Sequence, residues 1–188
     1  MHRFERVLSQ VLHGTLPLGF LLRNAFKDRW VRFHSLPQAK RYPEKPDETE
    51  TVLERMNALA SWLLEDTEPV WLVHCKFAAR ESPLERKIQT GDRTLSFVTA
   101  FEDPDLFGPD ECWSVYAGET RWNSGSADDL LGAIAQDEVF GVTWISEKTG
   151  AIFAPYDGGA DCFPETAERT AELKRTFPNW LSRRADGL

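Results

Sequence analysis

The chain interrupts an apolar strand with the residues Ala154-Pro155-Tyr156-Asp157-Gly158-Gly159-Ala160-Asp161. Pro155 removes one backbone donor from any strand ladder that this stretch joins. Gly158 and Gly159 adopt positive φ at no steric cost, which predicts a tight reversal of the chain at this point. Asp157 and Asp161 flank the glycines, so the stretch predicts a specific turn with two carboxylates beside it.

The residues before this turn predict a β-hairpin. Residues 139–145 and 151–156 are apolar runs, and the loop between them ends in Gly150, which suits a left-handed position. Further apolar or alternating stretches predict strands at 30–35, 70–75, 95–101 and 113–122. The charged residues 80–93 are expected to form a loop.

Amphipathic periodicity predicts helices at residues 4–12, 52–64, 126–134 and 165–176. Asp47 and Glu50 are spaced as a capping box for the second helix, and Ser126 and Asp129 as a cap for the third. Consecutive strands with short connections favour antiparallel pairing. We therefore predict one α+β domain over residues 1–188, with a mainly antiparallel sheet of about five to six strands covered by about three to four helices.

Cysteine usage and hydropathy indicate a cytoplasmic protein. The three cysteines, Cys75, Cys112 and Cys162, form no C-x-x-C pair, which disfavours a disulfide framework or a zinc site. No run approaches the roughly 18 apolar residues of a membrane span, and no signal peptide is evident at the N-terminus.

Gly-rich phosphate loops and the G-x-S-x-G nucleophile motif are absent. We therefore expect no metal, no cofactor and no catalysis.

Charge is distributed unevenly along the chain. Residues 1–41 carry eight Lys and Arg against two acids, Glu5 and Asp28, a net charge of +6; because the whole chain has −8, the rest carries −14. This acidic excess disfavours free nucleic acid as a partner and favours a basic protein, although a merely solvated acidic surface explains it as well. Five acids are concentrated in the loop between the strands at 95–101 and 113–122: Glu102, Asp103, Asp105, Asp110 and Glu111.

Two groups of residues are candidates for binding. Asp157 and Asp161 would hold a hard cation or accept hydrogen bonds from a basic partner, or would simply bond the amides of their turn. Arg32 and His34 project from one face of the strand at 30–35, and Arg41 follows in a basic loop. These cations would bind a phosphate or a carboxylate, or Arg32 would instead pair with an acid of the chain itself. The candidate ligand- or partner-binding residues are thus Arg32, His34, Arg41, Tyr156, Asp157, Gly158, Gly159 and Asp161.

Two histidines form a third group of candidates. His34 and His74 would lie on neighbouring strands if the two predicted strands paired, with Asp157 or Asp161 nearby. Their spacing in the sequence matches no metal-binding motif.

Three segments resemble a bacterial family catalogued only as domain of unknown function 3885. They are residues 22–23 through 30–37 with Lys40-Arg41-Tyr42, residues 152–161, and Asn179-Trp180-Leu181-Ser182. The resemblance implies a bacterial protein with an early arginine-bearing strand, a late Tyr-Asp turn and a terminal Trp-Leu, and it implies no established activity. The family pattern Tyr-Asp-Asp-Arg-Gly is replaced here by Tyr156-Asp157-Gly158-Gly159, so the chain lacks one acid and one arginine of that pattern.

These observations favour a non-catalytic protein-interaction module, similar in role to an antidote or immunity protein, that presents an acidic face to a basic protein partner. The abundance of aromatic residues agrees with this role, because aromatic side chains anchor protein interfaces. The alternative is a small-ligand-binding protein or an enzyme that uses a cleft formed by Arg32, His34, Asp157 and Asp161.

Overall fold

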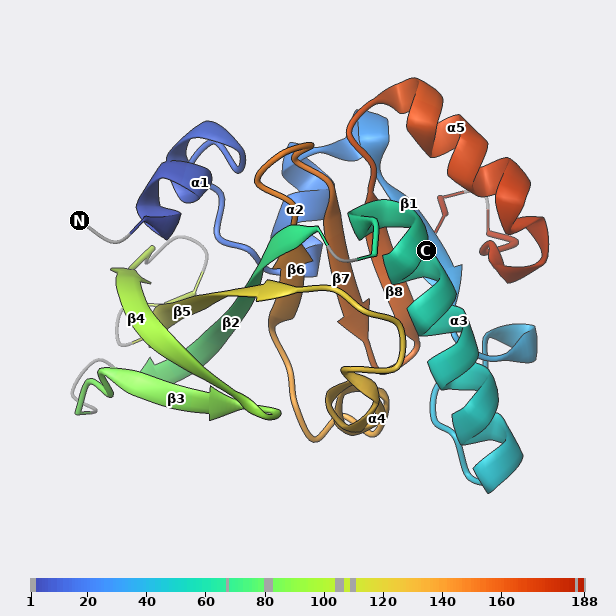
Figure 1. The fold of residues 1–188 in the computed structure, drawn as a ribbon, viewed down its shortest axis with the longest axis horizontal. Coiled ribbons are helices and arrows are strands. Elements are labelled where there is room, and N and C mark those ends of the chain that lie inside the picture. Colours follow the sequence, from blue (N-terminus) through green and yellow to red (C-terminus); the bar gives the residue numbers. More distant parts are fainter. Residues whose placement is uncertain are drawn as a thin grey trace.

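Eight strands form one antiparallel sheet within the residues that the computed structural model describes, namely 3–66, 68–79, 83–103, 107–108, 111–184 and 186–187 (Figure 1). In spatial order they are β1 (Val31–His34), β8 (Gly159–Phe163), β7 (Ile152–Tyr156), β6 (Val142–Ile145), β2 (Pro69–Ala79), β5 (Glu111–Arg121), β4 (Arg93–Phe101) and β3 (Lys87–Thr90). The long central pair β2–β5 is flanked by the hairpin β6–β7 on one side and by β4 on the other.

Five α-helices accompany this sheet in the described residues: α1 (Phe4–Gln10), α2 (Gly19–Ala25), α3 (Pro46–Leu64), α4 (Asp128–Ala135) and α5 (Ala167–Thr176). Helices α3 and α4 pack on one face of the sheet, where α3 contacts both β7 and β8. Helices α1 and α2 pack on the opposite face. None of the helices in the described segments combines the length and the apolar character needed to cross a membrane.

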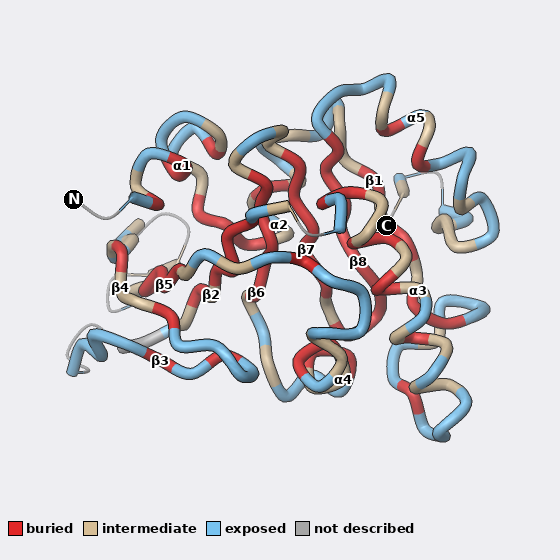
Figure 2. Tube along the Cα trace, viewed as in Figure 1, coloured by how far each residue is buried: buried red, intermediate tan, exposed pale blue. Residues whose placement is uncertain are grey.

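The core has two layers because the sheet buries both of its faces. Along β2, Val70 and Leu72 join the layer beneath α3 and α4, whereas Trp71 and Val73 join the layer beneath α1. Figure 2 shows the result, since strands β6, β7 and β8 are buried along most of their length and β5 is buried in its middle, while the helices expose one side. The apolar character on both faces of 70–75, which predicts an interior strand, reflects this arrangement.

The α+β class is confirmed, but the predicted numbers of strands and helices are too low. Helix α2 and strands β3 and β8 were not predicted. Strand β3 has only Ile88 and Thr90 buried, so its sequence within residues 80–93 resembles a polar loop. Strand β8 contains Gly159 and Asp161, whose sequence predicts a turn, and α2 spans seven residues of which only Leu22 is buried.

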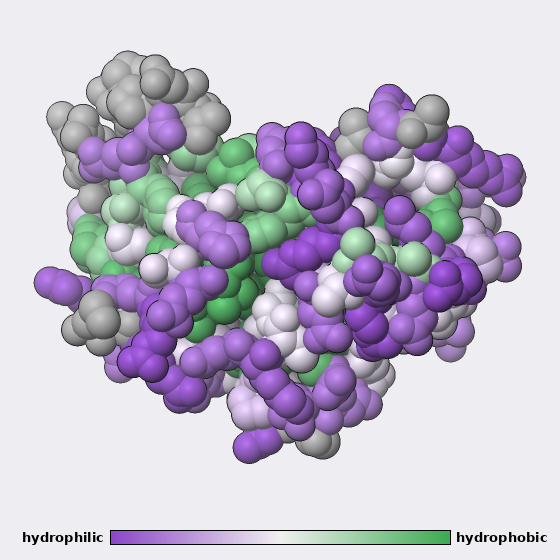
Figure 3. Space-filling model, turned by 90° about the horizontal axis from the view of Figure 1, so that it is seen from above, coloured by the Kyte–Doolittle hydropathy of each residue, from purple (hydrophilic) through white to green (hydrophobic). Residues whose placement is uncertain are grey.

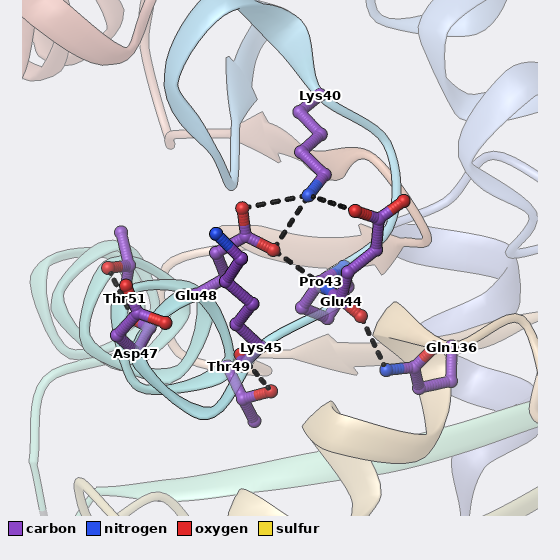
Figure 4. Close-up of polar contacts among 9 residues, drawn as sticks. All are labelled: Lys40, Pro43, Glu44, Lys45, Asp47, Glu48, Thr49, Thr51 and Gln136. Atoms are coloured by element: carbon purple, nitrogen blue, oxygen red, sulfur yellow. Dashed lines mark hydrogen bonds and ion pairs between the residues drawn. The ribbon is translucent and has the colours of Figure 1, made fainter.

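Helix α3 begins differently from the prediction. The expected capping box is wrong: its N-cap is Lys45, without a side-chain cap hydrogen bond, and Glu48 instead accepts a hydrogen bond from the Glu44 amide at 2.7 Å. Glu48 also binds Lys40 Nζ at 2.7 and 2.8 Å (Figure 4). These contacts tie the segment before α3 to its first turn. The predicted Ser126 cap is wrong as well, because Ser126 Oγ donates to the Asn123 carbonyl.

Candidate functional site at the β1, β8 and β7 edge

Strands β7 and β8 form a second hairpin, which is joined by a two-residue turn at Asp157 and Gly158. Strand β1 pairs with the edge of β8 that faces away from β7. Neither Gly158 nor Gly159 has positive φ, so the predicted reason for these glycines is wrong. A Cβ on Gly159 would lie 1.9 Å from the Phe33 carbonyl oxygen. Position 159 therefore requires glycine, because the paired backbone of β1 lies too close to leave room for a side chain.

Asp161 is the most buried acid of the predicted site, with 2% of its surface exposed. Arg32 lies opposite it in the β1–β8 register and donates from Nε and Nη2 to its two carboxylate oxygens, each at 2.8 Å. Trp30 Nε1 donates to the same carboxylate at 2.8 Å. Of the alternatives for Arg32, the structure shows pairing with an acid of the chain, in the bidentate geometry of strong charge-assisted hydrogen bonds.

The guanidinium of Arg32 also packs on an aromatic ring. Its Cζ lies 4.6 Å from the ring centroid of Tyr156, within range of a cation–π interaction. Burial alone lowers the pKa of Arg32, but the hydrogen bonds and charge of Asp161 raise it overall. Burial also raises the pKa of Tyr156. Both groups consequently keep their protons at physiological pH, so neither is suited to act as a base.

Asp157 forms the second ion pair of the site, with Arg41 Nε. The side chain of Arg41 is 64% exposed, in contrast to the 16% of Arg32, so this pair is accessible to solvent. Tyr42 lies beside the pair, and hydrogen bonding to Asp157 raises its pKa. The structure thus shows each aspartate in a side-chain ion pair, where one of the predicted alternatives was hydrogen bonding to the turn amides. The Arg32–Asp161 pair is more buried than the Arg41–Asp157 pair.

Four of the predicted residues line one pocket of about 190 Å³ on the α2 side of the sheet, here named the Arg32 pocket: Arg32, Tyr156, Asp157 and Asp161. The other walls are apolar, and Phe20 and Phe140, which are 40% and 52% exposed, stand among them. His34 does not join this pocket and lines a different groove near the C-terminal segment. The structure therefore brings together three members of the proposed four-residue cleft.

Thr143 in β6 also lines the Arg32 pocket and was not predicted from the sequence. It is 1% exposed, and its hydroxyl has no hydrogen-bond partner among the described residues. A buried hydroxyl without a partner is costly, so such groups are uncommon in folded proteins. The sequence gives no signal for it, because a threonine in a strand is ordinary.

The two histidines considered together are far apart in the sheet. Strands β8, β7 and β6 lie between β1, which carries His34, and β2, which carries His74. His74 Nδ1 instead lies 2.8 Å from Thr90 Oγ1, and burial lowers the pKa of His74 to about 4. No cluster of three or more His, Cys, Asp or Glu side chains that could hold a metal ion occurs in the described residues.

The three segments that carry the family resemblance are neighbours in this structure. The early segment contributes β1, which pairs with β8 of the late segment, and Phe33 also forms a bridge with Leu181 of the terminal segment. A hairpin, an edge strand and the C-terminal segment, far apart in sequence, therefore build one region of the surface (Figure 1).

These features define an α+β protein whose edge strand carries a buried Arg–Asp pair beside a pocket. Residues 18–185 match the model of the family described as Domain of unknown function (DUF3885), and the chain belongs to that family. No curated protein and no solved structure shows significant similarity to the chain.

Proposed function

We propose that this is a bacterial cytoplasmic protein that acts without catalysis, by binding a basic protein partner in the manner of an antidote or immunity protein. The observation that carries the proposal is a partly exposed group of aromatic rings, here named the aromatic surface: Phe77, Phe107, Trp113 and Phe140. Trp113 contacts the other three, with ring centroids 5.6, 5.7 and 6.1 Å apart. Phe77 and Phe140 are 51% and 52% exposed.

Phe77 and Phe140 are exposed beside the partly buried rings of Phe107 and Trp113, and an apolar patch of this kind favours an interaction role, because exposed apolar patches often mark binding surfaces. In the view of Figure 3, hydrophobic residues gather on the left half of the molecule, whereas hydrophilic residues dominate the right half. Phe140 belongs both to the aromatic surface and to the mouth of the Arg32 pocket. A partner seated on the aromatic surface would therefore also reach that pocket.

The charge near the aromatic surface favours a basic partner. Glu102, Asp103 and Glu111 are close in sequence to Phe107 and Trp113. The other two acids predicted for this loop, at positions 105 and 110, lie outside the described residues. Acids around an apolar centre attract an oppositely charged partner and raise its association rate more than its final affinity.

Site-specific photo-crosslinking in the source cell tests this proposal. A photoreactive phenylalanine analogue at position 77 or 140 is expected to capture one basic protein, and the same analogue at Arg175, exposed on α5, is not. With the captured protein purified, the association rate should fall steeply between low and physiological salt. Glu102→Gln with Glu111→Gln should lower it further. Equal capture from position 175, or an association rate indifferent to salt and to these substitutions, would contradict the proposal.

A second candidate function is the binding of a small amphipathic molecule in the Arg32 pocket, and the unpartnered hydroxyl of Thr143 favours it. The apolar walls suit an apolar body, and Thr143, Tyr156 and Asp157 suit a polar end that donates and accepts hydrogen bonds. Thr143→Val keeps the shape of the side chain and removes the hydroxyl. We expect it to stabilise the free protein by roughly 1 kcal/mol. It should also abolish the binding of fragments that perturb the NMR signals of Tyr156, and unchanged stability and unchanged fragment binding would argue against this candidate.

A further inference from the structure

A groove of about 390 Å³, here named the C-terminal groove, lies between the end of β1, α3 and residues 179–184. Its charged lining consists of Arg55, Arg183 and Arg184, and none of its described lining residues is an acid. His34 also lines the groove, but burial and the charge of Arg32 lower its pKa, so its imidazole adds little positive charge at neutral pH. Such a lining is unusual in a chain with a net charge of −8. The groove therefore concentrates positive charge on an otherwise acidic protein.

Arg55 is the half-buried cation of the groove. Its Nη1 donates to the His34 carbonyl at 3.1 Å, and its Cζ lies 5.3 Å from the ring centroid of Trp180. It forms no ion pair with any described residue, and burial lowers the pKa of Arg55. A partly desolvated guanidinium without a carboxylate is unfavourable, and a bound anion would offset that cost.

The other two arginines stand at the rim. Arg183 is exposed and has no ion pair among the described residues. Arg184 pairs with Asp186 at an Nη2–Oδ2 distance of 2.7 Å, and the two side chains are 69% and 46% exposed. Such exposed pairs are weak, so Arg184 exchanges its carboxylate for another anion at low cost.

The walls of the groove are held in place. Trp180 stacks on Phe177 with ring centroids 4.4 Å apart, and Leu181 bridges to β1. On the facing wall, Gln38 and Ala39 have φ of 59° and 56°. Two consecutive non-glycine residues in the left-handed region are strained, and such strain is typical of sites where the backbone is shaped for a purpose.

We propose that the C-terminal groove binds a small molecule through a phosphate monoester group. A dianionic phosphate offers enough charge and enough acceptor oxygens for two or three guanidinium groups, whose planar forks match it. The Trp180 ring already stacks on Phe177 and has the Arg55 guanidinium 5.3 Å from its centroid, which disfavours stacking of a nucleobase there. The site is separate from the aromatic surface and does not depend on the protein partner proposed above.

Isothermal titration at constant ionic strength tests the assignment with glycerol phosphate, inorganic phosphate, acetate and a short single-stranded oligonucleotide as probes. Glycerol phosphate should bind saturably and at least about tenfold more tightly than acetate. Comparable binding of inorganic phosphate would identify the phosphate group alone as the ligand chemistry, and weaker binding would show that the ester carbon skeleton contributes. Preference for acetate or for the oligonucleotide, or no saturable binding of either phosphate, would overturn the proposal.

Two variants and one control locate the binding. Arg55→Gln and Arg183→Gln should each weaken glycerol phosphate binding about tenfold, whereas Arg175→Gln, on the exposed side of α5, should leave it unchanged. Because Arg55 also supports the β1 backbone, Arg183→Gln decides the result if Arg55→Gln fails to fold. Binding that survives Arg183→Gln unchanged would place it elsewhere and overturn the assignment.

Discussion

At the scale of single residues, the edge of the sheet depends on positions whose neighbours come from distant parts of the chain. Gly159 is needed because the Phe33 carbonyl passes where a side chain would start, and Asp161 is buried because Arg32 and Trp30 supply three hydrogen bonds to it. These contacts join segments that are about 130 positions apart in the sequence. Both positions thus control whether β1 stays attached to the sheet.

Gly159→Ala should destabilise the protein by roughly 1–3 kcal/mol or more, because the new methyl group forces β1 away from β8. Gly132→Ala is the matched control, since nothing lies within 4 Å of a Cβ at that position in α4, and helix propensity predicts a neutral or slightly stabilising effect. Urea denaturation measures both. Equal unfolding midpoints for the two variants would contradict the close-approach explanation.

Arg32→Ala should cost about 3–5 kcal/mol, because it leaves Asp161 charged and buried without its partner. Arg41→Ala breaks an ion pair of the same hairpin whose arginine is 64% exposed, and it should cost less than half as much. The double variant Arg32→Ala with Asp161→Asn should be more stable than the sum of the single changes predicts. Additive losses in denaturation experiments would show that the two side chains do not interact energetically.

Phe33→Ala is a separate test of the β1 assignment. Phe33 is fully buried and packs edge-on against Phe177, so its truncation should cost roughly 3–5 kcal/mol. The measurement is again the free energy of unfolding in urea. A loss below about 1 kcal/mol would be incompatible with a fully buried side chain at this position.

At the scale of elements, the sheet curls so that its end strand contacts its centre. Strands β5 and β4 separate β2 from β3 in the sheet order, yet His74 of β2 contacts Thr90 of β3. Thr90 is buried by this contact although its strand is short and largely polar. The curl therefore turns a segment with weak strand character into a part of the core.

His74 should make stability depend on pH. Its pKa is about 4 in the folded protein and 6.5 in the unfolded chain, so the unfolded chain takes up the proton first as the pH falls. Stability from this group is complete above about pH 6.5 and decreases toward pH 4, by roughly 3 kcal/mol in total. His74→Gln should flatten the decline between pH 7 and pH 5, measured by urea denaturation. An identical slope in both proteins would exclude His74 as its cause.

At the scale of the whole molecule, stability should be highest at the centre of the sheet and lowest at its ends. Residues 71–74 of β2 pair with β5 on one side and β6 on the other, whereas β3 pairs with β4 alone among the described strands. The aromatic surface lies where Phe77 of β2 pairs with Trp113 of β5, and the Arg32 pocket is lined in part by Val142 and Thr143 of β6. The aromatic surface and the Arg32 pocket therefore both border the part of the sheet where strands are paired on two sides.

Native-state hydrogen exchange tests this gradient. The amides of Leu72 and Val73 are expected to exchange only through global unfolding, and those of Ile88 and Gln89 through local opening at a lower free energy. Exchange measured by NMR over a range of low denaturant concentrations separates the two modes. Equal protection of β3 and β2 would show that the curled end strand is part of the central cooperative unit.

The sequence by itself determined the α+β class, six of the eight strands and four of the five helices of the described residues, because apolar periodicity reports burial within one element. It also located the residues of the Arg32–Asp161 and Arg41–Asp157 pairs without pairing them. Tertiary structure alone decided which charges meet, that Gly159 serves a close approach, that Thr143 faces a pocket, and that β3, β8 and α2 exist. The physical reason is that these features depend on contacts between segments far apart in the chain, which local patterns do not encode.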